Sequence, residues 1–277
     1  MKTYSEDVIL FLIFGEGCRS MKFYVDLNSD IGEGYGSYKL GMDEEIIKCV
    51  SSINLACGWH AGDPMIMDKT VKLAIEHGVN VGAHPGYPDL LGFGRRAMTI
   101  TREEAKNYML YQTGALMAFT KANGINLQHM KLHGGFYNKA CVDPELAAGV
   151  IDGIEALDKD IILMVLSGSY IAKEAKKRGL RVSEEVFADR GYNPDGTLVN
   201  RSKPGAFVKD IDEALPRVIR MIKEGKVTAV DGQDIDIKAD SICVHGDNPK
   251  AMEFVQKIRA GLIEAGIEIK PIEDFIK

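Results

Sequence analysis

Short apolar runs alternate with amphipathic segments along most of the chain. Amphipathic segments with helical spacing of their apolar residues cover residues 64–77, 102–121 and 249–264. Apolar runs of strand length lie near residues 22–27, 51–57, 79–83, 128–133, 161–166, 184–188 and 240–245. Continuous apolar runs separated by helices are typical of parallel strands that are buried on both faces. The pattern therefore predicts an α/β fold.

The expected helices carry recognisable first turns. Asp-Pro or Asn-Pro pairs stand at 63–64, 143–144 and 248–249, where the first residue can cap the helix and the proline suits its first turn. Thr101 and Glu104 have the spacing of a capping box. About seven strand–helix units in roughly 250 residues favour a closed (β/α) barrel of parallel strands over an open, doubly wound sheet.

Four of the six histidines occupy the same kind of place in this pattern. His60, His84, His133 and His245 each close an apolar run and are followed within two residues by glycine or proline. Catalytic groups collect where parallel strands end, so the repetition predicts an enzyme. His60 and His84, with a nearby carboxylate, are candidate ligands of a divalent metal ion such as zinc. The alternative is that each is a hydrogen-bonded structural residue.

Acidic residues stand at the end of the first apolar run, in the stretch DLNSD at 26–30. A period of two places Asp26, Asn28 and Asp30 on one side of a strand. Paired carboxylates can divide the roles of acid and base between them, whereas turn formation and backbone capping are the structural alternative. Asp63 is a further carboxylate that could complete a metal site. Glu33 is expected to be a solvated loop residue.

Other charged residues follow later strands. Lys131 and His133 alternate in MKLHGG and so share one face. A buried lysine is costly without an anionic partner, so Lys131 is a candidate for binding substrate or phosphate. Asp189 and Arg190 form either an ion pair at a strand end or a clamp for an anion.

Two aspartates recur in similar settings, Asp63 in HAGDP and Asp247 in HGDNP. Helix capping is the structural explanation for both, and a role in catalysis or substrate binding is the functional one. His77 lies at the expected end of a helix and His129 inside an expected strand. Neither of these two histidines is given a function.

Composition excludes several classes of protein. The 277 residues are 45% hydrophobic and carry a net charge of -6, without a long Lys/Arg cluster, which disfavours nucleic acid as a partner. The five cysteines are widely spaced and include no CxxC pair. This disfavours a disulfide scaffold or a structural zinc site and suggests a reducing cytoplasm. Neither GxGxxG nor GxxxxGK[ST] occurs, so no phosphate-binding loop is recognisable.

The N-terminus differs from the rest of the chain. The apolar run VILFLIF at 8–14 is too short to span a membrane, and it lacks the basic segment of a signal peptide. Met21 begins a stretch that reads like a natural start. We therefore expect residues 1–20 to be an extension outside the core fold and residues 21–277 to form a single barrel domain.

The motifs at the strand ends, taken in order, resemble the LamB/YcsF family, the lactam utilisation proteins that form the A subunits of bacterial 5-oxoprolinases. The matching stretches are DLNSDIGEG (26–34), NLACGWHAGD (54–63), GAHPGYPD (82–89), FGR (93–95), KLHGGFYN (131–138), EVFADRGY (185–192), LVNRS (198–202) and CVHGD (243–247). KLHG stands where KPHG is usual, and GWHAG where GFHAG is usual. We interpret both departures as changes in packing.

This resemblance implies a distorted (β/α) barrel similar to those of glycoside hydrolases and carbohydrate deacetylases. It also implies ATP-dependent, hydrolytic opening of 5-oxo-L-proline (pyroglutamate) to L-glutamate, together with subunits B and C. The expected catalytic residues are Asp26, Asp30, His60, His84 and His133. The expected substrate-binding residues are Asn28, Asp63, Lys131, Asp189, Arg190, His245 and Asp247.

Two other functions remain open at this point. One is a stand-alone, metal-dependent deacetylase acting on N-acyl sugars, and the other is a non-catalytic subunit that holds substrate for its partners. ATP is expected as a co-substrate of the complex. Because the chain has no recognisable nucleotide motif, we expect ATP to be handled at least partly by the partner subunits.

Overall fold

The computed structural model describes residues 22–245 and 249–277 of the chain. Seven parallel strands form a closed barrel, since each pairs with the next and the last pairs with the first. In barrel order they are β1 (Phe23–Ile31), β2 (Ser52–Ala56), β3 (Asn80–His84), β4 (His129–Met130), β5 (Ile162–Leu166), β6 (Val182–Phe187) and β9 (Ser241–Cys243). The predicted closed (β/α) barrel is confirmed.

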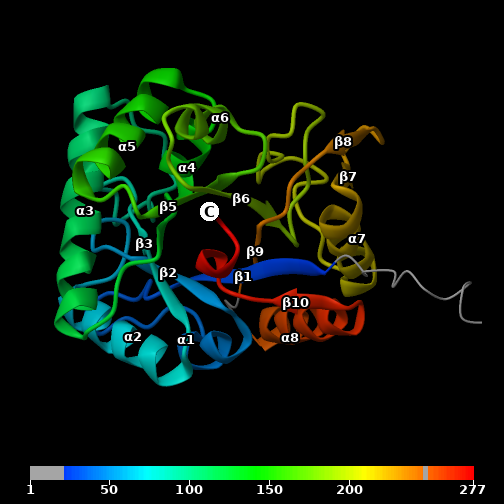
Figure 1. Cartoon of the computed structure of the whole chain (residues 1–277), viewed down its shortest axis with the longest axis horizontal. Coiled ribbons are helices and arrows are strands. Elements are labelled where there is room, and N and C mark those ends of the chain that lie inside the picture. Colours follow the sequence, from blue (N-terminus) through cyan, green and yellow to red (C-terminus); the bar gives the residue numbers. More distant parts are fainter. Residues whose placement is uncertain (1–21, 246–248) are drawn as a thin grey trace, which may run out of the picture.

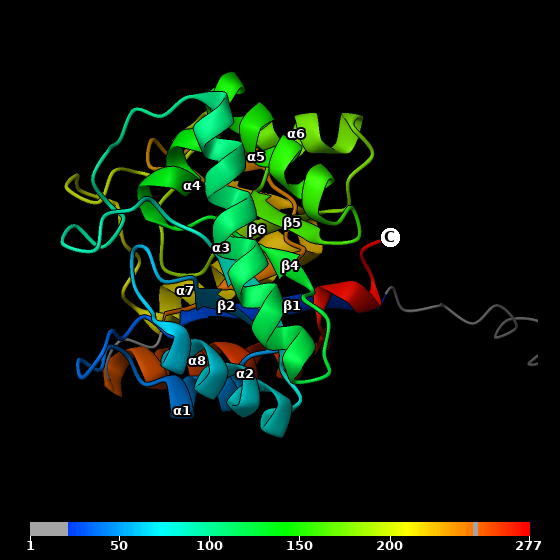
Figure 2. The same cartoon turned by 90° about the vertical axis from the view of Figure 1, so that its left-hand side faces the viewer.

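Helices surround the strands, as Figure 1 shows. They are α1 (Asp43–Ile46), α2 (Pro64–His77), α3 (Arg102–Ala122), α4 (Gly134–Ala140), α5 (Pro144–Leu157), α6 (Tyr170–Lys177), α7 (Ile211–Glu224) and α8 (Pro249–Glu264), with short 3-10 helices at Ile47–Cys49 and Ile272–Asp274. Helices α3 and α5 lie side by side on one flank of the barrel (Figures 1 and 2). The three helices predicted from apolar spacing agree with α2, α3 and α8 to within one residue.

The predicted first turns are present where the structure describes them. The side chains of Asp63 and Asp143 accept hydrogen bonds from backbone N–H groups in the first turns of α2 and α5. Thr101 and Glu104 form a complete capping box on α3. The predicted cap at Asn248, the candidate Asp247 and the extension at residues 1–20 lie outside the described residues.

Several elements were not predicted. Strands β7 (Lys226–Thr228) and β8 (Asp234–Asp236) form an antiparallel hairpin within the long connection between β6 and β9. Strand β10 (Ile267–Ile269) pairs with the first residues of β1. The predicted strand at 128–133 was too long, because the regular ladder of β4 ends at Met130. No helix among residues 22–245 and 249–277 is long and apolar enough to cross a membrane.

The interior of the barrel contains polar side chains as well as apolar ones. Asp26 is fully buried and accepts hydrogen bonds from the hydroxyls of Ser51 and Ser52, both at 2.7 Å, and from that of Ser241. Burial raises the pKa of Asp26 to about 6, against the opposing effect of these hydroxyls. Buried polar groups are tolerated when they are hydrogen-bonded, so Asp26 ties β1 to its neighbours on both sides.

Replacement of Asp26 by Asn should change how stability depends on pH. Because the folded-state pKa of about 6 exceeds the usual 3.8, folding takes up a proton between these values. This contribution to stability is complete below about pH 4 and is lost as the pH rises through about 6, with an upper limit of about 3 kcal/mol. Urea unfolding across this range should show the advantage of wild type over Asp26→Asn shrinking with rising pH. Parallel stability curves would contradict the assignment.

Candidate active site at the mouth of the barrel

A pocket of about 530 Å³ opens at the carboxyl ends of the barrel strands. Because all seven strands are parallel, residues that follow different strands meet at this rim. Polar and charged side chains that line it include Asp30, Glu33, His84, Arg95, Lys131, His133, Asn138, Arg190, Asn200, Arg201 and His245. Six residues predicted for the site are therefore brought to one space: Asp30, His84, Lys131, His133, Arg190 and His245.

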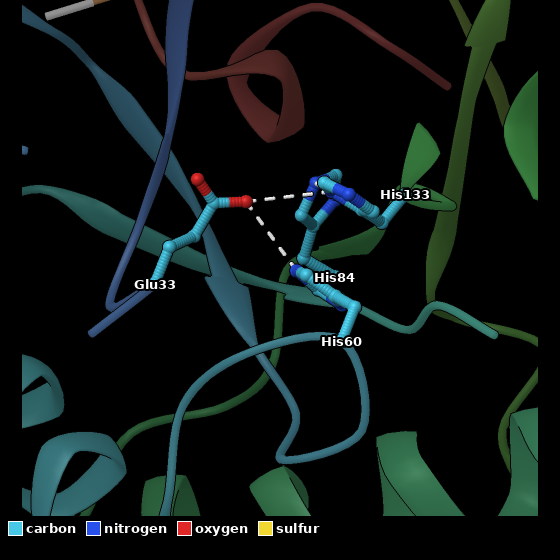
Figure 3. A group of neighbouring side chains, drawn as sticks. All are labelled: Glu33, His60, His84 and His133. Carbon is cyan, nitrogen blue, oxygen red and sulfur yellow. Dashed lines mark hydrogen bonds and ion pairs between the residues drawn. The ribbon is translucent and has the colours of Figure 1, made fainter. Parts of the chain in front are cut away.

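Three histidines and a glutamate form the most compact group at this mouth. Oε1 of Glu33 lies 3.3 Å from both Nε2 of His60 and Nδ1 of His133. Nδ1 of His133 lies 2.9 Å from Nε2 of His84. The rings of His60 and His133 stack at 3.7 Å, and His84 meets both edge-on. Figure 3 shows the carboxylate of Glu33 pointing at the imidazoles.

The expectation that Glu33 is solvated was wrong. Its side chain is only 17% exposed and faces His60 and His133. The chain turns at Gly32, which has a φ of +70°, directly after β1, and this turn carries Glu33 back over the mouth of the barrel. Burial lowers the pKa of His60 to about 3, with a further lowering by His133, so the His60 imidazole is neutral.

Backbone carbonyls fix two of these imidazoles. Nδ1 of His84 donates to the carbonyl of Lys131 at 2.8 Å, and Nε2 of His133 donates to the carbonyl of Phe93 at 2.8 Å. Phe93 has a φ of +53°, which is unusual for a residue other than glycine. Unfavourable backbone conformations of this kind concentrate at functional sites. Here the conformation directs a carbonyl at His133.

Two glycines leave room for the imidazoles. A Cβ atom at Gly86 would lie 2.6 Å from Nδ1 of His60. A Cβ atom at Gly94 would lie 2.8 Å from Cδ2 of His133 and also 2.8 Å from Cβ of His60, and Gly94 has a φ of +62°. The glycines in GAHPG and FGR therefore allow the backbone to pack directly against the histidine cluster.

A second group of charges is centred on Lys131. Its ammonium lies 2.7 Å from Oε1 of Glu185 and 3.0 Å from Oδ1 of Asp30, and 3.2 Å from Sγ of Cys243. Burial would lower the pKa of Lys131, but Asp30, Cys243 and Glu185 outweigh it and hold the pKa well above its usual value. The anionic partner expected for Lys131 is thus supplied by the protein.

Sequence reasoning missed Glu185. This residue lies in β6, is fully buried, and accepts a hydrogen bond from the hydroxyl of Tyr137 at 2.8 Å. Its strand was recognised from the apolar run around it. The only signal for a role was that Lys131 required a buried anion. Cys243 is also buried, and its Sγ contacts the ammonium of Lys131.

Asp189 and His245 form an ion pair beside this group, with Nδ1 of His245 2.9 Å from Oδ2 of Asp189. Burial would lower the pKa of His245, but Asp189 and Cys243 raise it well above its usual value. Arg190 donates instead to the carbonyls of Val199 at 2.6 Å and Ala206 at 3.0 Å. The direct Asp189–Arg190 ion pair considered from the sequence is therefore not formed.

Arg95, Arg190 and Arg201 all line the pocket. Among the side chains described by the structure, no carboxylate lies within ion-pair distance of any of the three. Guanidinium groups bind carboxylate and phosphate oxygens in paired hydrogen bonds. The pocket therefore has unneutralised positive charge that suits an anionic ligand.

Other predicted site residues lie away from the pocket. Asp63 caps α2 and also accepts a hydrogen bond from the backbone N–H of Gly36 at 2.8 Å, so both its oxygens are occupied by backbone groups. Asn28 lies below the rim, where it donates to Glu185 at 3.1 Å and to Ser241 at 2.7 Å. Asp26 is lower still on β1, so the catalytic role predicted for it has no support from its position.

Comparison with known proteins shows to which family this chain belongs. Residues 25–277 match the model of the LamB/YcsF family. The chain belongs to this family. It is 73% identical over 257 residues to a 5-oxoprolinase A subunit of Fusobacterium nucleatum, covering 93% of this chain and 100% of the relative. It is 58% identical over 253 residues to a 5-oxoprolinase A subunit of Pyrococcus horikoshii, covering 91% and 99%.

Solved structures support the fold of this family member. A lactam utilization protein from Thermus thermophilus superposes with a TM-score of 0.85 at 48% identity, covering 90% of this chain and 99% of that protein. A mutant pseudoenzyme of carbohydrate esterase family 4 superposes with a TM-score of 0.50 at 13% identity, covering 92% and 67%. At this low identity the second likeness concerns the barrel fold alone.

Replacement of Gly86 by Ala should destabilise the protein by about 1–3 kcal/mol, because the new methyl group would press on His60. Gly114 is a matched control. It lies in α3, and a Cβ there would meet its nearest neighbour at 4.0 Å. Gly114→Ala should therefore stabilise by up to about 1 kcal/mol. Urea unfolding of both variants measures the difference. A Gly86→Ala protein as stable as wild type would show that His60 is loosely held.

Proposed function

We propose that this chain acts as the A subunit of an ATP-dependent 5-oxoprolinase and supplies the hydrolytic site that opens 5-oxo-L-proline to L-glutamate. The observation that carries the proposal is one pocket that holds acid and base side chains together with arginines that form no ion pair among the residues the structure describes. The substrate is inferred from the names of relatives that match nearly the whole chain. Subunits B and C are the proposed partners.

The pocket suits the substrate in size and charge. 5-Oxo-L-proline is a small, planar lactam with one carboxylate, and its activated form would carry a phosphate as well. The pocket volume of about 530 Å³ is within the usual range for small-molecule sites. Arg95, Arg190 and Arg201 can bind the carboxylate and the phosphate.

The chemistry explains why ATP is needed. A five-membered lactam is a resonance-stabilised amide that closes again easily, so direct hydrolysis is slow. Phosphorylation of the lactam oxygen makes the ring carbon more electrophilic. Water then adds to this carbon, the C–N bond breaks as the nitrogen takes a proton, and an acyl phosphate forms. A second water converts the acyl phosphate into the γ-carboxylate of L-glutamate and phosphate.

Two side chains suit the proton transfers. Burial would raise the pKa of Asp30, but His84 and Lys131 hold it well below its usual range, so Asp30 is an ionised acceptor for a proton from water. His245 is protonated because of Asp189 and can donate to the ring nitrogen as the C–N bond breaks. Both residues line the same pocket. We propose that the partner subunits bind ATP and transfer its phosphoryl group.

A metal-dependent deacetylase is the second candidate function. It is favoured by the Glu33–histidine cluster, whose donor set suits a metal ion. In that case the chain alone would release acetate from N-acetyl sugars without ATP. A polypeptide that only holds substrate for its partners is the third candidate.

Reconstitution separates these functions. The chain alone should form no glutamate from 5-oxo-L-proline, whereas the chain with subunits B, C and ATP should. His245→Asn should lower kcat about 100-fold because a general acid is lost. His77→Asn, on the exposed end of α2, is the matched control and should leave kcat unchanged. Size-exclusion chromatography verifies that each variant still assembles.

Four outcomes would contradict parts of the proposal. Glutamate formed by the isolated chain without ATP would remove the need for partners. ATP-independent release of acetate from N-acetyl sugars would favour the deacetylase. Full activity of both His245→Asn and Asp30→Asn within an intact complex would favour a substrate-holding role. Tight binding of ATP by the isolated chain would overturn the assignment of ATP to the partners.

A further inference from the structure

Lone pairs of nitrogen and oxygen atoms point into the space enclosed by Glu33, His60, His84 and His133. A carbonyl oxygen can only accept a hydrogen bond, so the carbonyls of Lys131 and Phe93 place the ring protons on Nδ1 of His84 and Nε2 of His133. In the neutral rings, Nε2 of His84 and Nδ1 of His133 then carry lone pairs. These two nitrogens face each other at 2.9 Å, a separation that two acceptors cannot hold without a positive charge nearby.

Carboxylates add to this concentration of negative charge. Oε1 of Glu33 lies 3.3 Å from Nδ1 of His133, and Oδ2 of Asp30 lies 3.3 Å from Nε2 of His84. A single shared proton would join only one pair of these atoms. One ion can instead contact Glu33 and all three imidazoles, because their four donor atoms lie within 4.8 Å of one another.

His60 completes the donor set with one of its two ring nitrogens. Its side chain is fully buried, and its Nδ1 has no hydrogen-bond partner among the residues that the structure describes. A buried polar nitrogen without a partner is unfavourable. The other nitrogen, Nε2, points at Glu33. Nε2 is therefore the atom that a metal ion would contact, whereas the unpartnered Nδ1 faces Gly86.

We propose that Glu33, His60, His84 and His133 bind one divalent transition-metal ion. In a tetrahedral site with bonds of about 2.0–2.1 Å, neighbouring ligand atoms lie about 3.3 Å apart, which matches the Glu33 separations of 3.3 Å. Three nitrogens and one oxygen suit Zn²⁺ or Co²⁺, whereas Mg²⁺ and Ca²⁺ prefer oxygen ligands. The two carbonyls that orient His84 and His133 are the usual outer partners of metal-binding histidines.

The neighbouring group of Asp30, Cys243 and His245 also has potential ligands, but it already contains a cation. The ammonium of Lys131 lies 3.0 Å from Asp30 and 3.2 Å from Cys243. His245 is paired with Asp189. Neither a lysine nor an arginine forms an ion pair with Glu33 among the described residues. The metal site is therefore assigned to the histidine cluster.

The ion would border the pocket, because Glu33, His84 and His133 line it while His60 lies behind them. A metal ion in this place polarises a bound water or a substrate carbonyl. That role applies to ring opening and to deacetylation alike. The site therefore does not depend on which substrate the enzyme uses, and it can be tested without any substrate.

Metal content of the full chain, expressed without a polyhistidine tag, tests the site. Chelator-treated protein is loaded with Zn²⁺ or Co²⁺ and desalted, and elemental analysis should find about one ion per chain. Bound Co²⁺ should show visible absorption typical of nitrogen and oxygen ligands. Isothermal titration with Zn²⁺ should give a Kd that Glu33→Gln and His84→Gln each weaken at least about 10-fold. Zn²⁺ should also raise the Tm of wild type.

Two controls make the result specific. His245→Asn removes a ligand candidate of the neighbouring group, and His77→Asn removes an exposed histidine. Both should bind Zn²⁺ as wild type does. Glu33→Gln keeps the shape of the side chain, and circular dichroism of the metal-free variants verifies their folding.

The site would be overturned if loaded wild type retained neither Zn²⁺ nor Co²⁺. It would also be overturned if Glu33→Gln and His84→Gln bound Zn²⁺ as tightly as wild type, or if only His245→Asn lost binding. Metal binding without any glutamate formation in the reconstituted complex would leave the site intact and reject the proposed function. Glutamate formation by the reconstituted complex with a metal-free chain would leave the proposed function intact and show that the ion takes no part in ring opening.

Discussion

Closure of the barrel by β1 and β9 is the constraint on which the site depends. Three residue pairs form this parallel contact, Asp26 with Ser241, Leu27 with Ile242 and Asn28 with Cys243. The side chains of Asp26 and Asn28 each hydrogen-bond to Ser241 across the same seam. Because the closed sheet is entirely parallel, every strand ends at one rim. Asp30, Lys131 and His245 meet there although more than 100 residues separate each from the next.

Charge inside this mouth is divided into two neighbouring parts. Lys131 supplies a fixed cation to Asp30 and Glu185, so that part is balanced within the protein. The histidine cluster has a carboxylate and inward-facing nitrogens but no comparable cation among the described side chains. With the proposed ion bound, the pocket would hold two different positive groups, the ammonium of Lys131 and the metal ion. Under the proposed function, the arginines that have no carboxylate partner among the described side chains bind the anionic ends of the ligand, and Lys131 keeps its own partners.

Sequence patterns correctly predicted the features that depend on residues close together in the chain. Alternation correctly placed Asp26, Asn28 and Asp30 on one side of β1, which faces the barrel interior, yet only Asp30 reaches the pocket, because four residues of strand span about 13 Å. Depth along a barrel axis depends on how far each strand extends past its neighbours, and the alternation does not contain that information. Glu33 and Glu185 were missed for a related reason: a turn at Gly32 redirects one, and a lysine far along the chain neutralises the other.

The separate motifs GAHPG, FGR and KLHGG describe parts of one physical unit. The carbonyl of Phe93 accepts from His133, the carbonyl of Gly94 accepts from the N–H of Gly135 at 2.9 Å, and Gly86 packs against His60. A change in any of these loops therefore displaces an imidazole that belongs to another. Since metal affinity and proton transfer both fall steeply when ligands move by a fraction of an ångström, these loops must fit together as closely as the core. The glycines that look like loop residues in the sequence are packing residues of the site.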